Sequence, residues 1–101
     1  MPILRITRGK IQPGTWDQFE AGWHKAVEQL GRYPGIVSRS LVRNIDDPNE
    51  GYAMSVWENL EALESYEKSA LAKTVTPMMK SFFTGDYQSH HCEILYWEMK
   101  A

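Results

Sequence analysis

The adjacent residues His90, His91 and Cys92 form the densest group of potential metal ligands in the chain. We expect them on a strand, where neighbouring side chains point to opposite faces, so His90 and His91 cannot bind one ion together. His90 and Cys92 would share a face, but two ligands are too few for a zinc site, and the sequence has no CxxC or HxxxH motif to complete one. The pattern therefore predicts no metal site, and it favours Cys92 as a small buried side chain rather than a nucleophile.

His24 and Tyr66 are the side chains best suited to proton transfer or to hydrogen bonding with a ligand. His24 lies about 110° from the centre of the apolar face of its helix, counting ~100° per residue, beside Glu20 and Glu28. It is either a surface histidine in a row of charges or a general base at the rim of a pocket. Tyr66 lies at the inner edge of another helix, where a buried hydroxyl needs a partner. Its role is either structural packing or contact with a bound ligand.

Several large, soft side chains favour an apolar cavity around a bend that we expect at Pro77. Each of them alone fits an ordinary core, and they are Trp23, Met78, Met79, Phe82 and Phe83. The glycines do not follow the spacing of a phosphate-binding loop. We therefore expect no nucleotide or flavin cofactor.

The length and charge of the chain restrict its function further. A chain of 101 residues is expected to form one domain over residues 1–101, and a net charge of −2 without a basic run disfavours nucleic acid as a partner. No apolar run approaches the roughly 18 residues of a membrane span, and no signal peptide is recognisable. The single cysteine fits a reducing compartment, so the expected location is cytoplasmic.

Alternating side chains predict four strands that would position these residues, at residues 3–7, Ile36–Arg43, 52–57 and 88–98. The segment 46–51, DDPNEG, is the strongest turn signal in the chain and predicts a hairpin between the second and third strands. Residues 82–86 are expected to be an irregular link before the last strand.

Helical spacing predicts three helical segments between the strands. The first carries Trp16, Phe19, Trp23, Ala26, Val27 and Leu30 on one face. It is expected to begin with a capping box of Thr15 and Gln18 and to end at Gly31. The second is expected to begin at Asn59, whose side chain can accept from a free helix N–H, and residues 69–80 continue as a helix bent at Pro77.

The order β-α-β-β-α-β predicts an α+β, ferredoxin-like fold in which helices cover one face of a four-stranded antiparallel sheet. The uncovered face should be polar if it meets water. The last strand departs from that rule, because Ile94 and Tyr96 occupy one face while Leu95 and Trp97 occupy the other. This pattern predicts that a second copy of the chain covers the open face, which makes the protein a homodimer.

Residues 56–79, VWENLEALESYEKSALAKTVTPMM, resemble the signature of the antibiotic biosynthesis monooxygenase family. The resemblance lies in an aromatic strand end at Trp57, a polar break, a Glu-Ala-Leu helix start at residues 61–63, Tyr66 one turn later and then Ser69. The Pro-Gly-Thr start of the first helix and the aromatic last strand agree as well, so the resemblance covers most of the chain.

The resemblance implies a dimeric α/β barrel with one pocket per subunit between helices and sheet. Many family members are thought to oxygenate electron-rich aromatic molecules without metal or flavin, because the substrate carbanion itself reduces O2 while the protein positions it and stabilises charge. The haem-degrading branch has an Asn, a Trp and a His where this chain has Thr7, Tyr66 and Thr76. Haem degradation is therefore disfavoured.

The resulting hypothesis is a cofactor-independent monooxygenase acting on a small aromatic or polyketide-like molecule. Tyr66 would donate a hydrogen bond to the substrate oxyanion, Thr7 would assist it, and His24 would accept the first proton if it turned inward. The pocket would be lined by Trp23, Trp57, Met78 and Phe82. The alternative is a non-catalytic module of the same fold that binds a small hydrophobic molecule or serves in assembly.

Overall fold

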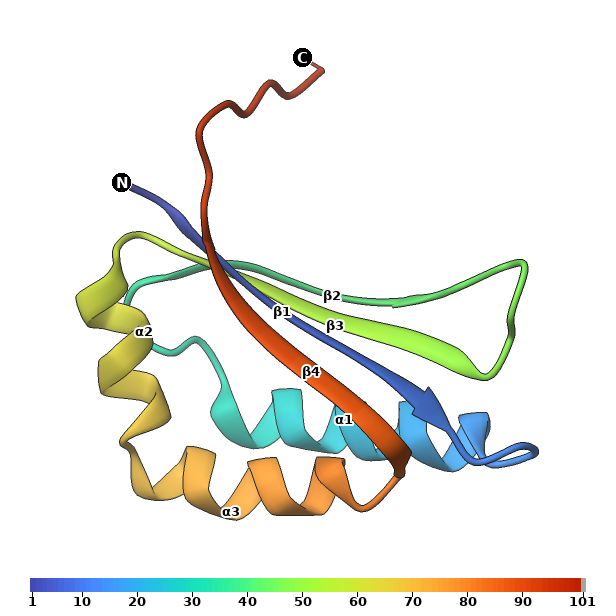
Figure 1. Cartoon of the computed structure of the whole chain (residues 1–101). Coiled ribbons are helices and arrows are strands. Elements are labelled where there is room, and N and C mark those ends of the chain that lie inside the picture. Colours follow the sequence, from blue (N-terminus) through green and yellow to red (C-terminus); the bar gives the residue numbers. More distant parts are fainter. Residues whose placement is uncertain (101) are drawn as a thin grey trace.

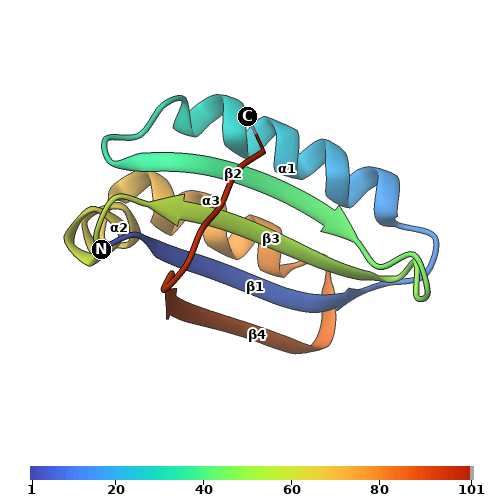
Figure 2. The same ribbon diagram turned by 90° about the horizontal axis from the view of Figure 1, so that it is seen from above.

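The computed structural model describes residues 1–100, with the side chain of Asp86 left aside. Its elements follow the order β1 (Ile3–Ile11), α1 (Trp16–Leu30), β2 (Ile36–Arg43), β3 (Glu50–Trp57), α2 (Leu60–Glu67), α3 (Ala70–Lys80) and β4 (Phe83–Glu93). The strands form one antiparallel sheet in the order β2-β3-β1-β4, as Figure 2 shows. The helices all lie on one side of it (Figure 1). The predicted α+β, ferredoxin-like arrangement is confirmed.

The β2–β3 hairpin and the start of α2 form as predicted. Residues 36–43 pair with β3 on the far side of the turn. The Asn59 side chain accepts a hydrogen bond from the Ala62 N–H at 2.9 Å, which satisfies one of the free donors at the start of α2. The capping box at α1 does not form, because the Thr15 hydroxyl donates to the Gln12 carbonyl at 2.6 Å instead. Gly31 ends α1 with φ at 56°, as expected.

Pro77 does not interrupt the helix. Pro77 lies inside α3, and the helical path breaks earlier, between α2 and α3. Ser69 stabilises this break from both sides, because its hydroxyl donates to the Tyr66 carbonyl at 2.6 Å and accepts from the Ala72 N–H at 3.1 Å. The corner at Ser69 turns α3 under the sheet and sets the direction of the residues that precede β4 (Figure 1).

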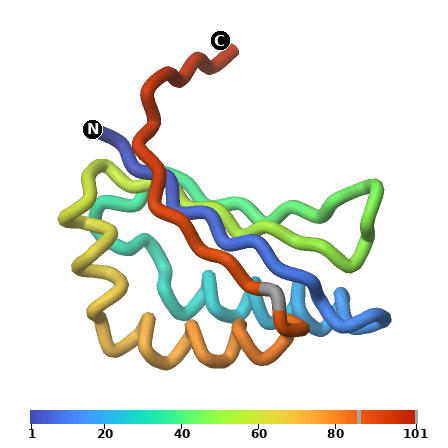
Figure 3. Tube along the Cα trace, in the orientation of Figure 1, coloured from blue at the N-terminus to red at the C-terminus, as the bar shows by residue number. Residues whose placement is uncertain are grey.

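The last strand begins and ends earlier than the predicted 88–98. Phe83 already pairs with Ile11, and Glu93 pairs with Ile3, the first residue of β1. Beyond it, the Ile94 N–H still donates to the Pro2 carbonyl, at 3.1 Å. The strand ends here because β1 offers no further partner. Residues 94–100 then leave the sheet on the side opposite the helices (Figure 3).

The helix-covered face of the sheet carries the core. Its largest fully buried side chains are Trp57, Phe19, Ile11 and Leu63. The opposite face has no helix over it (Figure 1), although half-buried apolar side chains occupy it, among them Leu4, Ile6, Met54 and Val56. No helix within residues 1–100 has the length and hydropathy needed to cross a membrane.

Candidate functional site

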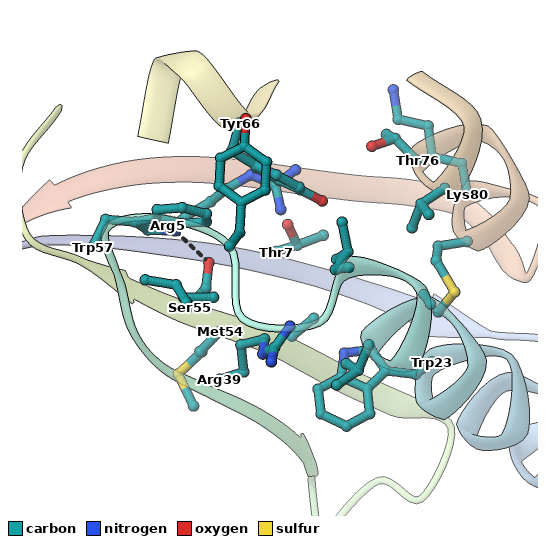
Figure 4. Close-up of a pocket in the computed structure, with 18 of the residues that line it drawn as sticks. Arg5, Thr7, Trp23, Arg39, Met54, Ser55, Trp57, Tyr66, Thr76 and Lys80 are labelled. Carbon is teal, nitrogen blue, oxygen red and sulfur yellow. Dashed lines mark hydrogen bonds between the residues drawn. The ribbon is translucent and has the colours of Figure 1, made fainter. Parts of the chain in front are cut away.

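A cavity of about 110 Å³ lies between the helices and the covered face of the sheet. Strand alternation brings side chains of all four strands to this face, and α1, α2 and α3 close it from the other side. Most of the lining is apolar or aromatic and includes Phe19, Trp23, Val27, Leu30, Trp57 and Met79. A few polar groups interrupt it, of which Figure 4 labels Arg5, Thr7, Arg39, Ser55, Tyr66, Thr76 and Lys80. An apolar cavity with few polar groups is typical of a small-molecule site.

Tyr66 is held at this cavity by two neighbouring aromatic rings. Its ring stacks on that of Trp57, with centroids 5.1 Å apart and planes 25° from parallel, and the ring of Tyr33 meets it edge-on at 5.4 Å. Trp57 is fixed in turn, because its indole N–H donates to the Ser55 hydroxyl at 2.9 Å, drawn as the dashed line in Figure 4. Tyr66 is only 8% exposed, so these contacts leave its ring little freedom.

The Tyr66 hydroxyl is an uncommitted hydrogen-bond donor. Within residues 1–100, and leaving aside the Asp86 side chain, it has no hydrogen-bond partner. Burial raises the pKa of Tyr66 above its usual value, while the positive charges of Arg5 and Arg39 oppose that shift. The hydroxyl is therefore protonated near neutral pH, which makes it a donor to a ligand rather than a base.

Thr7 and Arg5 lie beside each other on the covered face of β1. Thr7 is 5% exposed, and its hydroxyl lies 3.2 Å from that of Ser89 on β4. The Arg5 Nε donates to the Glu67 carboxylate at 3.1 Å, and the same oxygen lies 3.0 Å from the His91 ring nitrogen. Arg5 thus reaches the cavity with its charge already paired.

Arg39 also reaches the cavity, from β2, but it differs from Arg5 in its hydrogen bonding. Its Nη1 is buried and has no hydrogen-bond partner in the described part of the chain. Together with Arg5 and Lys80 it gives the lining three cationic side chains. Among the described residues, the lining contains no carboxylate and no imidazole. Most of the cavity wall is therefore apolar, and the charged side chains in it are all cationic.

The structure brings four of the seven predicted site residues together. Thr7, Trp23, Trp57 and Tyr66 all line the cavity. Met78 and Phe82 do not line it, and their neighbours Met79 and Phe83 do. The shift follows from the fold, because α3 continues through Pro77 and β4 begins at Phe83.

His24 does not line the cavity and lies instead at a second hollow between α1 and β2, which Leu41 and Arg43 also line. Its side chain is 63% exposed, and its ring nitrogen lies 3.7 Å from the Glu20 carboxylate. This is the surface position that the helical angle predicts for it.

His90 and Cys92 share one face of β4, as their spacing indicates. Among the described residues, no three His, Cys, Asp or Glu side chains come together in a way that could hold a metal ion. Cys92 is exposed, so the expectation of a buried cysteine was wrong. It lies on the face of β4 that no helix covers, opposite Leu4 of β1.

Sequence reasoning missed Arg39, Arg5 and Ser55. A signal for the two arginines was present in the strand alternation. Arg39 shares its face with Leu41, and Arg5 shares its face with Ile3 and Thr7. A cation on the apolar face of a strand is costly to bury without a partner, which marks it as a residue with a role.

Comparisons with known proteins agree with this geometry. The family model described as antibiotic biosynthesis monooxygenase matches residues 2–77. No curated protein matches the chain.

Solved structures of similar fold include relatives from several bacteria. A Bordetella bronchiseptica protein that carries the same family description is 25% identical, with a TM-score of 0.80 over 94% of this chain and 98% of that one. SnoaB from Streptomyces nogalater, described as a cofactor-independent oxygenase and solved as a point mutant, is 17% identical, with a TM-score of 0.84 over 95% of each chain. Rv0793 from Mycobacterium tuberculosis is 15% identical, with a TM-score of 0.82 over 98% of this chain and 100% of that one.

Proposed function

The chain belongs to the antibiotic biosynthesis monooxygenase family, and we propose that it is a cofactor-independent monooxygenase acting on a small aromatic or polyketide-like molecule. One observation carries the proposal. A protonated tyrosine hydroxyl without a partner among the described residues is held rigidly at an apolar cavity. The description of SnoaB as a cofactor-independent oxygenase supports the reaction class.

The reaction assigned to this cavity needs positioning and charge stabilisation more than reactive side chains. The carbanion form of an electron-rich substrate reduces O2 and forms a C–O bond, and the O–O bond of the resulting peroxide then breaks. One oxygen atom stays on the carbon as a carbonyl, and the other leaves as water with the two hydrogens that the carbon has lost. The protein would hold the ring between Trp23, Trp57 and the other apolar groups, and would stabilise the negative oxygen of the substrate. Tyr66 would donate the hydrogen bond to that oxygen, with Thr7 assisting from β1.

The proton that the substrate loses has no acceptor among the described side chains that line the cavity. His24 was the candidate base, but it does not line the cavity. His24 therefore has no role in the proposed reaction. The lost proton would pass to solvent, either before the substrate binds or through the mouth of the cavity.

We also propose that two copies of the chain associate through their uncovered sheet faces. Leu4, Ile6, Met54 and Val56 place apolar surface on that face, which is unusual for a sheet that meets only water. Residues 94–100 extend from the same side and expose Leu95, of which 82% is accessible. A second copy would cover both features. A single cysteine, which cannot form a disulfide within the chain, suits a reducing compartment, and we propose the cytoplasm.

Oxygen uptake tests the proposed reaction against the alternative of a non-catalytic binding module. The purified, metal-free protein is supplied with anthrones, quinols and hydroxyquinolines in an oxygen electrode. Uptake that rises in proportion to protein concentration supports the monooxygenase. Compounds that raise the melting temperature without any oxygen uptake would instead indicate a binding protein.

A further inference from the structure

The charged side chains that line the cavity are all positive. This feature bears on the choice of substrate, which the proposed reaction class leaves open. Arg5, Arg39 and Lys80 line the cavity, whereas no aspartate or glutamate does among the described residues. The whole chain carries a net charge of −2, so the positive cavity does not reflect the overall composition. A positive pocket within a negative chain favours an anionic ligand.

The three cationic side chains differ in whether other residues of the protein already interact with their charged groups. Arg5 is paired with Glu67 at 3.1 Å, and the Lys80 ammonium lies over the Tyr87 ring, 5.2 Å from its centroid. Arg39 forms no ion pair and no side-chain hydrogen bond with a described residue, and its Nη1 is buried. An arginine fork is shaped for a planar pair of oxygens or a single oxyanion, and burying its N–H groups unpaired is unfavourable. Arg39 is therefore the group that a ligand would satisfy.

The size and the walls of the cavity define the rest of the ligand. The volume of about 110 Å³ is below the ~150 Å³ of an engineered apolar cavity that takes benzene. Trp23, Trp57 and Leu30 supply flat and apolar walls. A single aromatic ring is therefore the largest ring system that this space could take with small side-chain movements, and a fused polycyclic molecule would require the cavity to widen further.

We propose that the substrate is a single-ring aromatic molecule that binds as an anion, with its negatively charged oxygen on the Arg39 guanidinium. The inference rests on the proposed function and narrows its substrate class. It also explains why no described base lines the cavity, because a phenol or enol that binds as its anion has already lost its proton. Tyr66 and Arg39 then contact the same electron-rich ring system, and no histidine is needed.

The ionisation of bound 4-nitrophenol tests this inference without any turnover. Its phenolate absorbs visible light, so a pH titration with protein in excess and oxygen excluded reports the apparent pKa of the bound probe. A cation in contact with the phenolate should lower that pKa by at least about one unit, which is a tenfold preference for the anion. An unchanged or raised pKa with the wild-type protein overturns the inference.

Substitutions at two positions of the same strand assign the effect to Arg39. Arg39→Gln should return the pKa of the probe to its value in free solution, and Arg39→Lys should retain part of the shift. Arg43→Gln is the matched control, because Arg43 lies four residues along β2, contacts the Trp16 ring and does not line the cavity. A shift that survives Arg39→Gln in a protein with the wild-type circular dichroism spectrum overturns the assignment.

Competition provides a second readout that needs no variant. Benzoate should displace 4-nitrophenol at a concentration at least roughly tenfold lower than its neutral counterpart benzamide. Equal displacement by the two compounds contradicts the inference.

Oxygen uptake separates this result from the proposed function. Preference for the anion without oxygen uptake by any compound would support the anion site and reject the monooxygenase. Oxygen uptake with neutral compounds only would support the monooxygenase and reject the anion site.

Discussion

The ring of Tyr66 on α2 stacks on the ring of Trp57 at the end of β3, with centroids 5.1 Å apart. Asn59 caps the helix that begins just after Trp57, so the two aromatic residues are linked by a short and well-defined corner. The stack fixes the Tyr66 ring, while its hydroxyl stays without a partner among the described residues. Packing and hydrogen bonding are therefore separable at this residue.

Tyr66→Phe should lower the rate of oxygen uptake by about 10²–10³, because losing one donor to a developing oxyanion typically has this effect. The stack on Trp57 is retained, so the melting temperature should change little. Tyr52→Phe is the control, since it removes a tyrosine hydroxyl on the opposite face of the sheet, where it donates to Glu50 at 2.7 Å. Equal rates for wild type and Tyr66→Phe would remove Tyr66 from the mechanism.

Glu50 should make stability depend on acid pH. Its carboxylate accepts hydrogen bonds from Tyr52, Asn44 and Arg8, which lower its pKa from 4.5 to about 2. The unfolded chain therefore binds a proton that the folded chain does not, and Glu50 contributes stability above pH 4.5 that is lost as the pH falls towards about 2.

Urea unfolding across this pH range checks the prediction. Glu50→Gln should be less stable than wild type at neutral pH and should lose less stability on acidification. Glu28→Gln, an exposed change on α1, should follow the wild-type profile. Parallel profiles for wild type and Glu50→Gln would show that the Glu50 contacts contribute nothing to stability.

Gly35→Ala should destabilise the fold for two separate reasons. Gly35 has φ at +87°, and an added Cβ would lie 2.5 Å from the Cβ of Ala62. Gly14→Ala is the matched control, because Gly14 has φ at +80° with open space around it. We expect Gly14→Ala to cost roughly 1–2 kcal/mol from the backbone alone, and Gly35→Ala about 1–3 kcal/mol more from the close contact. Equal losses of unfolding free energy for the two variants, measured with denaturant, would show that α2 moves away from the added Cβ at no cost in stability.

Ile6→Lys should convert the proposed dimer to a monomer. Ile6 lies on the central strand β1, between Met54 of β3 and His90 of β4, on the face that no helix covers. Burying an unpaired ammonium between two sheets is unfavourable. Ile45→Lys is the control, because Ile45 is 95% exposed in the β2–β3 connection. Sedimentation should give a dimer for wild type and Ile45→Lys, and a monomeric wild type at micromolar concentration would refute the association.

Local patterns predict much of this fold because they report which face of an element is apolar. Residues 36–43 alternate and precede a strong turn, and the observed β2 has these bounds. The last strand could not be placed in this way. Alternation continues past Glu93, but strand pairing does not, because β1 begins at Ile3 and only the Ile94 N–H finds a carbonyl beyond it among the described residues, that of Pro2. The end of a strand depends on its neighbour, which a local pattern does not contain.

The candidate site, like the fold, could be predicted only in part. Trp23 and Tyr66 were predicted because helical periodicity points them inward, whereas Thr7 and Trp57 were predicted from the family resemblance. Arg39 was missed because a charged residue in a strand ordinarily faces water. Leu41 on the same face was a local signal, and the packing of the helices shows that this face of β2 is the covered one. The cavity therefore owes its apolar walls to a pattern visible in the sequence and its charge to the tertiary structure.

Incorporation of labelled oxygen by the metal-free protein tests the central claim most directly. A single-ring quinol that competes with 4-nitrophenol for the cavity is incubated under isotopically labelled O2, and the product is analysed by mass spectrometry. The account predicts one labelled oxygen atom in the product, formed in proportion to wild-type protein and strongly reduced with Tyr66→Phe. Compounds that occupy the cavity yet give no labelled product above the protein-free control would contradict it.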